Sequence, residues 1–221
     1  MNIKNIIFDL DGTVIDTLVD LARALSDTLE EFSLPRVTLA QTRTLLGGGA
    51  RQFVKGALKE KANDSVFFET FFTTYMKRYK AYQVEQSAPY PGMVDLLVWL
   101  KENGIRSFIF SNKPHDLSVE LIDQRLPGLF TGVHGHKPNT LPKPDRTMYD
   151  LFATEYHIDS QASIFVGDSE FDIEMGRVLG MPTIAVSYGY VDKPMLQMYH
   201  PDYLVDTVEE LKAQLITLVK Q

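Results

Sequence analysis

Residues 2–13, NIKNIIFDLDGT, join an apolar, β-branched run to two acids and a glycine. The run Ile3–Phe8 has the composition of a strand that is buried on both faces. Asp9 and Asp11 follow it, and Gly12 permits the tight turn that holds both carboxylates at the end of the strand. Ligands of open α/β sheets bind beyond the carboxyl ends of the strands, so this stretch predicts two functional acids at a sheet edge. Taken alone, an ordinary Asp-Gly turn explains the same residues equally well.

Shorter apolar runs recur along the rest of the chain and alternate with helical patterns. The predicted strands are Ser107–Phe110, Ser163–Val166, Thr183–Val186 and, more weakly, Tyr203–Val205. The predicted helices are Val94–Asn103, Leu117–Gln124, Thr147–Tyr156 and Phe171–Leu179. Strands that alternate with helices in this way are typical of βαβ units. The chain is therefore predicted to be an α/β protein with a doubly wound, mostly parallel sheet.

Residues 17–82 break this alternation, because they contain helical patterns and no convincing strand. Apolar residues recur there at the three-to-four spacing of amphipathic helices, both near the start of the segment and near its end. We predict that residues 17–82 form a small all-helical cap inserted after the first strand. Residues 1–16 and 83–221 are then predicted to form the α/β catalytic core.

The composition limits the partners of the protein. The net charge of −7 makes nucleic acid an unexpected partner, because an acidic surface repels a phosphate backbone. The chain has no cysteine, which excludes disulfides, zinc thiolate sites and thiol nucleophiles. The N-terminal apolar run is too short for a signal peptide, and no stretch approaches the ~20 apolar residues of a membrane span. We expect a cytoplasmic protein, monomeric or dimeric, without membrane contact.

Two polar groups outside the first stretch are candidates for phosphate binding. Ser111 and Asn112 follow a predicted strand, where a hydroxyl and backbone N–H groups are able to hold phosphate oxygens. They are also common helix caps, and this alternative stays open. Lys143 lies between two prolines in LPKPD. Its ammonium would neutralise phosphate charge as a point cation, or it is a solvated loop lysine.

A second acidic pair follows another predicted strand, in the stretch GDSEFD at residues 167–172. Asp168 ends the strand and Asp172 stands four residues later. Carboxylate oxygens are the ligands that Mg²⁺ prefers, so the pair is a candidate metal site. A helix cap at Asp168 or Ser169 is the alternative. All these acids and hydroxyls follow strands of one predicted sheet and are expected to meet at one face.

These residues resemble the haloacid dehalogenase-like superfamily, and more closely its phosphoglycolate phosphatase-like members. The four motifs of the superfamily appear in order as DLDGT, SN, the lysine of PKPD, and GDSEFD. The stretches LGGGAR (residues 46–51) and GDSEFDIEMGRVLGMPTIAVSYGY (residues 167–190) are similar to the subgroup. The resemblance covers essentially the whole chain, including the position of a helical cap after the first motif.

The resemblance implies catalytic roles for the motif residues. Asp9 is expected to attack phosphorus and become an aspartyl-phosphate. Asp11 is expected to protonate the leaving oxygen and then to activate water. Ser111 and the backbone of Asn112 are expected to bind the phosphoryl oxygens, and Lys143 to neutralise charge on the nucleophile and the phosphoryl group.

The resemblance also implies a metal site. Mg²⁺ is the expected cofactor, bound by Asp9, by the backbone carbonyl of Asp11 and by Asp168. Asp172 is expected nearby, outside the direct ligands. A divalent cation and a lysine would together remove the repulsion between a carboxylate nucleophile and a phosphate.

The implied activity is hydrolysis of small phosphate monoesters, with 2-phosphoglycolate as the leading candidate among small phosphorylated metabolites. Pyrophosphatases, nucleotidases and sugar phosphomutases of the β-phosphoglucomutase type belong to the same superfamily and remain alternatives. The mutases usually carry a Ser-Ser pair where this chain has Ser111-Asn112, which favours hydrolysis. A phospho-accepting signalling module is disfavoured, because such modules have about half this length and lack a cap. A catalytically dead binding protein is disfavoured, because no motif is missing.

Two further groups are interpreted from the residues. Gly47–Gly49 is hypothesised to bring backbone N–H groups to the substrate, with Arg51 or Arg43 pairing with a substrate carboxylate. The alternative is that these glycines only end a helix. His134 and His136 are interpreted as solvated loop residues, since no third metal ligand is evident.

Overall fold

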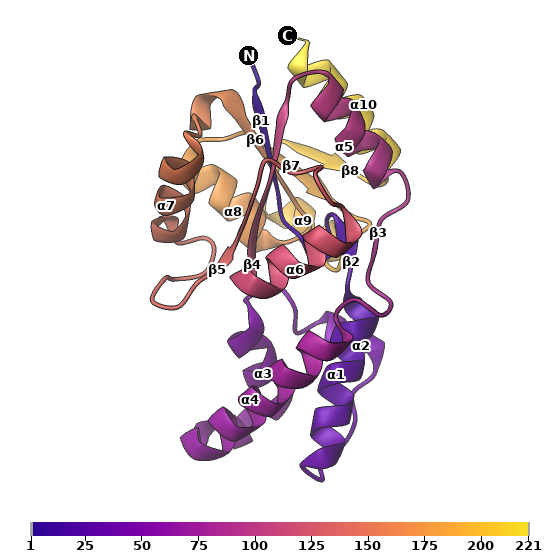
Figure 1. Ribbon diagram of the computed structural model, residues 1–221, viewed down its shortest axis with the longest axis vertical. Coiled ribbons are helices and arrows are strands. Elements are labelled where there is room, and N and C mark those ends of the chain that lie inside the picture. The colour runs from indigo at the N-terminus through magenta and orange to yellow at the C-terminus, as the bar shows by residue number, and fades with distance from the viewer. Residues whose placement is uncertain (1, 221) are drawn as a thin grey trace.

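The computed structural model of the chain describes residues 2–220. Its centre is a six-stranded parallel sheet with the strand order β5-β4-β1-β6-β7-β8 (Figure 1). The strands are β1 (Asn5–Phe8), β4 (Arg106–Pro114), β5 (Gly132–His136), β6 (Ser163–Gly167), β7 (Thr183–Val186) and β8 (Tyr203–Val205). The predicted α/β class with a doubly wound, mostly parallel sheet is confirmed.

Helices cover both faces of the sheet. They are α5 (Met93–Glu102), α6 (His115–Arg125), α7 (Arg146–Tyr156), α8 (Glu170–Leu179), α9 (Lys193–Met198) and α10 (Val208–Val219), with a 3₁₀ turn η2 (Ser160–Ala162). Successive side chains of a strand point to opposite faces. On β1, Ile6 and Phe8 accordingly pack in one apolar cluster with α5, α6 and α10. Ile7 packs in a second cluster with α7 and α8.

Residues 18–82, which we call the helical region, form a bundle beyond one end of the sheet (Figure 1). Its elements are α1 (Leu18–Glu31), α2 (Leu39–Arg43), α3 (Ala50–Leu58), a 3₁₀ turn η1 (Lys59–Asn63) and α4 (Ser65–Tyr82). The bundle has its own apolar cluster, in which Leu25, Phe71 and Tyr75 are almost fully buried. Leu117 of α6 is the buried residue of this cluster that comes from outside the helical region.

The chain enters and leaves the helical region through two short strands that pair with each other. These are β2 (Ile15–Asp16) and β3 (Ala88–Pro89), which are antiparallel. Asp20 on α1 is fully buried, and its carboxylate accepts hydrogen bonds from the backbone N–H groups of Gln86 and Ser87 and from the Ser87 hydroxyl. A buried carboxylate needs such donors to offset its lost hydration. The two crossing segments are therefore fixed to each other.

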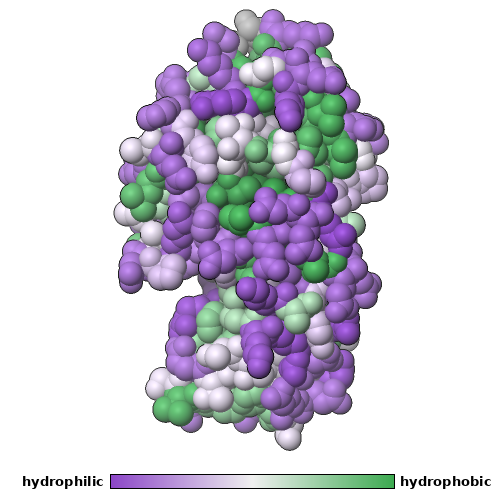
Figure 2. Space-filling model, in the orientation of Figure 1, coloured by the Kyte–Doolittle hydropathy of each residue, from purple (hydrophilic) through white to green (hydrophobic). Residues whose placement is uncertain are grey.

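The surface is mostly hydrophilic on the face drawn in Figure 2, and its outline narrows where the helical region meets the sheet. No helix among residues 2–220 combines the length and the apolar character needed to cross a bilayer.

The interpretation of His134 and His136 as solvated loop residues is wrong. Both lie on β5, at the edge of the sheet beside β4, and this strand was not predicted. The His134 ring is buried against Phe110 and Phe152. Burial, with smaller effects from nearby cations, lowers the pKa of His134 to about 4. The segment GVHGH lacks the apolar run that marks the other strands. It is a buried strand because neighbouring elements pack against it, and this packing cannot be seen in its own composition.

Candidate active site

The central position of β1 explains why distant motifs meet. β1 lies between β4 and β6, and all three strands run in the same direction. Asp9 follows β1 directly, Ser111 and Asn112 lie in the last part of β4, and Asp168 follows β6. The carboxyl ends of these strands form one edge, so the structure brings the four residues to one place.

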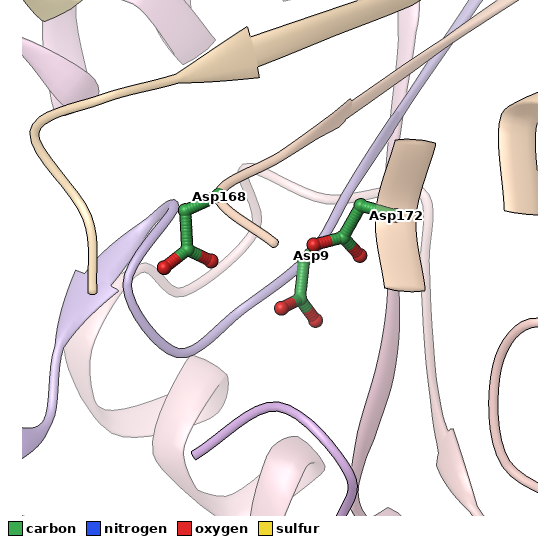
Figure 3. A group of neighbouring side chains, drawn as sticks. All are labelled: Asp9, Asp168 and Asp172. Atoms are coloured by element: carbon green, nitrogen blue, oxygen red, sulfur yellow. The ribbon is translucent and has the colours of Figure 1, made fainter. Parts of the chain in front are cut away.

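Three acids gather at this edge. One carboxylate oxygen from each of Asp9, Asp168 and Asp172 lies within 4.8 Å of the other two (Figure 3). Burial, and then repulsion from the other two acids, raises the pKa of Asp168 well above its usual range. Burial also raises the pKa of Asp172, to about 6, although Lys143 opposes the shift. Crowded buried carboxylates of this kind are costly unless a cation offsets their charge.

Lys143 supplies part of that charge. Its side chain is buried, and Nζ lies 2.6 Å from Asp172 Oδ1, 2.8 Å from Asp9 Oδ1 and 3.1 Å from the Phe110 carbonyl oxygen. Burial by itself lowers the pKa of Lys143, but Asp172 and Asp9 outweigh burial, and the net pKa is raised. The lysine therefore remains charged, and the alternative of a solvated loop lysine is excluded.

Asp172 has two functions in the local structure. Besides its contact with Lys143, its Oδ2 accepts hydrogen bonds from the backbone N–H and hydroxyl of Ser169. Ser169 is the N-cap of α8, and the two residues form a capping box. The cap expected at Asp168 or Ser169 is therefore formed by Ser169, and Asp168 stays directed at the site.

Asp168 is held by two donors. Its Oδ2 accepts from the backbone N–H of Tyr190 at 2.7 Å, and its Oδ1 accepts from the Thr13 hydroxyl at 3.1 Å. Gly12 lies against this carboxylate with φ of +84°, and a Cβ atom there would stand 2.3 Å from Asp168 Oδ2. The glycine of the first motif is therefore required both for the turn and for the approach of Asp168.

The donor set fits a divalent cation. Within the site the carboxylates of Asp9, Asp11, Asp168 and Asp172 outnumber the ammonium groups of Lys113 and Lys143. Asp9 Oδ1 is buried, and although Lys143 Nζ is 2.8 Å away, this oxygen receives no hydrogen bond of suitable geometry from residues 2–220. A buried acid oxygen with spare capacity in a group of three acids is suited to a hard metal ion. The Asp11 carboxylate is outside that group, and the prediction for Asp11 concerned its backbone carbonyl.

Asn112 connects three parts of the molecule. Its side-chain oxygen accepts from the backbone N–H of Lys143 at 2.7 Å, and its side-chain nitrogen donates to the Gly47 carbonyl at 2.9 Å. A Cβ atom added to Gly49, whose φ is +85°, would stand 3.1 Å from the Asn112 carbonyl oxygen. The Gly47–Gly49 segment of the helical region thus rests on β4. Neither Ser111 nor Asn112 caps α6, because the N-cap is Pro114.

Asp11 lies at the side of the site that faces the helical region. Its Oδ1 accepts from the Thr17 hydroxyl at 2.8 Å and from Lys113 Nζ at 3.2 Å. Lys113 Nζ also donates to the Tyr79 hydroxyl on α4. Asp11 therefore contacts the entry to the helical region directly, and it is linked to the last helix of that region through Lys113.

A cavity of about 70 Å³ opens between the sheet edge and the helical region. The sheet side contributes Asp9, Asp11, Ser111, Asn112, Lys113, Pro114, Asp168, Ser169, Tyr190 and Val191. The helical region contributes Leu21, Arg43, Leu46, Gly47, Gly49, Ala50, Phe53, Tyr75 and Tyr79. The polar wall and the mostly apolar wall thus come from different parts of the chain.

The structure does not place Arg51 where it could pair with a substrate in the cavity. Arg51 is exposed, forms an ion pair with Glu69 on α4, and stacks over Phe68 and Phe72. It does not line the cavity. Arg43 does line it, but its guanidinium donates to the carbonyls of Gly189 and Tyr190 and to Asp192. Arg43 therefore joins α2 to the loop after β7.

Sequence reasoning missed Lys113, Tyr79 and Tyr190. Lys113 directly follows the SN motif. A lysine at the carboxyl end of an apolar strand was a sequence signal that its charge lies at the site. Tyr190 closes the site through its backbone contact with Asp168, and its hydroxyl accepts from the Thr17 N–H at 2.7 Å. Nothing in the spacing of α4 marked Tyr79 as different from its aromatic neighbours.

Comparison with known proteins identifies similar chains. A family model described as haloacid dehalogenase-like hydrolase matches residues 6–186. A phosphoglycolate phosphatase of Agrobacterium fabrum is 34% identical over 203 residues, which cover 90% of this chain and 87% of that protein. One from Caulobacter vibrioides is 30% identical over 226 residues, with coverage of 99% and 93%. A crystal structure from Lactobacillus delbrueckii subsp. bulgaricus, provisionally described as a phosphoglycolate phosphatase, gives a TM-score of 0.88 at 26% identity over 96% of this chain and 98% of that one.

Proposed function

This chain belongs to the haloacid dehalogenase-like hydrolase family, and from that premise we propose that it is a magnesium-dependent phosphatase of small phosphate monoesters that uses Asp9 as its nucleophile. The observation that carries the proposal is the position of Asp9. Its carboxylate stands at the end of β1, beside Lys143, in a group of three acids, and on the wall of a cavity. A nucleophile, a cation and an acidic metal site in one place are what phosphoryl transfer requires.

In the first step of the proposed reaction, a carboxylate oxygen of Asp9 forms a bond to phosphorus as the ester P–O bond breaks. The leaving oxygen takes a proton from the Asp11 carboxyl, which makes it a neutral alcohol. Ser111 and the backbone of Asn112 hold the phosphoryl oxygens in line for attack. Lys143 keeps Asp9 from repelling the phosphate.

In the second step, water attacks the phosphorus of the aspartyl-phosphate. Its proton passes to Asp11, the bond between Asp9 and phosphorus breaks, and orthophosphate leaves. Asp11 thus acts as acid and then as base, and it ends the cycle as it began.

Mg²⁺ would be held by Asp9, by Asp168 and by the backbone carbonyl of Asp11, and when bound it would neutralise phosphate charge and fix the orientation of the reacting groups. Asp172 stays beside the site, where its contacts with Lys143 and Ser169 hold the lysine toward Asp9.

We assign residues 17–82 the role of a cap over the α/β core of residues 1–16 and 83–221. The support is the separate apolar cluster, the paired crossing strands β2 and β3, and the share of the cavity wall that comes from the helical region. A cap of this kind excludes water and contacts the part of the substrate that the phosphate site does not hold.

The relatives named phosphoglycolate phosphatase favour 2-phosphoglycolate as the substrate. The test is release of orthophosphate from a panel of phosphate esters with Mg²⁺, ranked by kcat/KM, with Asp9→Asn as the control. Turnover of 2-phosphoglycolate that requires both Mg²⁺ and Asp9 supports the proposal. Phosphate release that persists in Asp9→Asn, or isomerisation of a sugar phosphate without release, would overturn it.

A further inference from the structure

We propose that Lys113 recognises a carboxylate on the leaving group, by exchanging its ion pair with Asp11 for one with the substrate. This inference rests on the proposed phosphatase function, and it identifies the substrate class as phosphate esters of small hydroxy acids. It makes Lys113 a residue that determines specificity at the reaction centre.

The local backbone explains why Lys113 reaches the cavity. The pairing register between β4 and β5 shifts between Ser111 and Pro114, so Asn112 and Lys113 lie in an irregular part of the strand. Irregularities of this kind re-aim side chains beside active sites. The Lys113 side chain is only 2% exposed, and it lines the cavity together with Asp11 and Tyr79.

The contacts of Lys113 leave capacity for one more anion. An ammonium has three donors, and among residues 2–220 Nζ donates to Asp11 Oδ1 at 3.2 Å and to the Tyr79 hydroxyl. Asp11 is its one carboxylate partner in that part of the chain, whereas Lys143 is paired with both Asp9 and Asp172. The unused donor lets a substrate carboxylate contact Lys113 first, and the contact with Asp11 at 3.2 Å is the carboxylate contact that Lys113 then gives up.

Arg43, which also lines the cavity, already has partners within the protein. The Arg43 guanidinium bonds to two backbone carbonyls and Asp192, and its side chain is partly exposed to water. Around Lys113 the helical region presents Tyr75, Tyr79 and Phe53, which give a poorly solvated wall. Attraction between Lys113 and a substrate carboxylate is stronger in such surroundings than in water.

The exchange has a consequence for Asp11. In the free protein the ammonium of Lys113 holds the Asp11 carboxylate from one side, while the Thr17 hydroxyl holds it from another. A substrate carboxylate that takes the ammonium leaves Asp11 tied only to Thr17, free to take a proton from water and to deliver it to the leaving oxygen. A neutral leaving group offers Lys113 nothing in return, so Asp11 stays in its ion pair. The same contact would therefore favour both binding and turnover of acidic esters.

The test compares two substrates that differ in the carboxylate. They are 2-phosphoglycolate and 2-hydroxyethyl phosphate, assayed with wild type and with Lys113→Met. We expect wild type to prefer 2-phosphoglycolate by at least about tenfold in kcat/KM, because a charge-assisted contact discriminates on this scale. Lys113→Met should reduce kcat/KM for 2-phosphoglycolate on the order of 10- to 100-fold. It should reduce that for the neutral ester by a much smaller factor, which collapses the preference.

Two variants separate recognition from packing. Lys113→Arg keeps a cation and should retain most of the preference, while Tyr79→Phe removes one acceptor of the ammonium and should leave the preference within about threefold. Circular dichroism and thermal unfolding show whether Lys113→Met is folded. If this variant does not fold, the preference of wild type for 2-phosphoglycolate over 2-hydroxyethyl phosphate still tests the inference.

The outcomes distinguish this inference from the proposed function. If wild type hydrolyses both esters with similar kcat/KM, or if Lys113→Met loses both equally, the inference is overturned and the phosphatase function stands. If wild type hydrolyses neither ester nor any other in the panel, the proposed function itself fails.

Discussion

The two walls of the cavity differ in polarity: the edge of the sheet is charged, and the helical region is mostly apolar. The edge of the sheet gathers four buried charged groups, Asp9, Lys143, Asp168 and Asp172, of which Asp9 and Asp168 line the cavity. The helical region faces them with Leu21, Phe53, Tyr75 and Tyr79, which belong to its apolar cluster. Burying the charged groups of the first wall costs free energy of desolvation, whereas burying the apolar side chains of the second wall stabilises the fold.

This difference separates two tasks. Every phosphate ester shares the phosphoryl group, and only the charged edge is equipped to act on it. Esters differ in their leaving groups, which extend toward the helical region. Substitutions of the charged groups around Asp9 should therefore reduce turnover of all esters, and a substitution of Lys113, the charged group of the sheet edge that contacts the helical region, should change the ranking among them.

The largest effect is expected for Asp9→Asn. The amide cannot attack phosphorus, so kcat should fall at least about 10³-fold on every ester, which is roughly 4 kcal/mol in barrier. The variant should stay folded, because Asn has nearly the shape of Asp. Steady-state kinetics on 2-phosphoglycolate and p-nitrophenyl phosphate measure this. A loss of less than tenfold on either substrate would remove Asp9 from the role of nucleophile.

Asp168→Asn should separate activity from stability. We expect kcat/KM to fall about 10²-fold on both substrates, since removal of a charged metal ligand weakens electrostatic stabilisation of the transition state. The metal-free variant should unfold about 2–4 °C higher than wild type, because a neutral amide relieves the repulsion that raises the pKa of Asp168.

Thermal unfolding with and without Mg²⁺ completes that comparison. Mg²⁺ should raise the unfolding midpoint of wild type, because a ligand that binds the folded state stabilises it. The midpoint of Asp168→Asn should shift much less. A wild-type protein that is fully active in excess chelator and shows no Mg²⁺ shift would contradict the metal site.

Gly49→Ala tests where the boundary between the two walls lies. Gly49 belongs to the helical region but rests on Asn112, and its φ of +85° is unfavourable for alanine. We expect a loss of about 1 kcal/mol in the free energy of unfolding and roughly tenfold in kcat/KM on both esters. Urea unfolding and parallel assays provide the measurements. A selective loss on 2-phosphoglycolate would instead support the hypothesis that Gly47–Gly49 recognises the leaving group.

Arg51→Ala should have the smallest effect. Its ion pair with Glu69 is exposed, and exposed pairs contribute about 0–1 kcal/mol. Values of kcat/KM for both esters should remain within about threefold of wild type, since Arg51 does not line the cavity. A strong and selective loss on 2-phosphoglycolate would mean that the helical region rearranges to bring Arg51 to the substrate.

The strands that could be predicted from the sequence are those whose residues are apolar in themselves. β1, β6, β7 and β8 are short apolar runs, and Thr183–Val186 and Tyr203–Val205 match the structure residue for residue. β5 could not be predicted, because GVHGH is buried by α6, α7 and β4 and not by its own composition. The two-residue strands β2 and β3 have no sequence signal of their own, since each exists only through pairing with the other.

The site shows the same limit. Asp9 and Asp168 could be selected because acids directly follow buried strands. The buried ion pairs of Lys143 and Lys113 could not be derived from composition, because each depends on acids distant in the chain. The surface position of Arg51 could not be predicted either, because its partner Glu69 stands on another helix.

The most direct test of the central claim is to detect the phosphoryl group on Asp9. Asp11→Asn should form the aspartyl-phosphate from p-nitrophenyl phosphate, because this leaving group departs without an acid, and should hydrolyse it slowly, because the base is missing. After incubation with Mg²⁺ and a rapid acid quench, peptide mass spectrometry should find one added phosphoryl group on Asp9 and none in Asp9→Asn with the same treatment. A phosphoryl group on another residue, or turnover by Asp11→Asn with no labelled Asp9, would contradict the account.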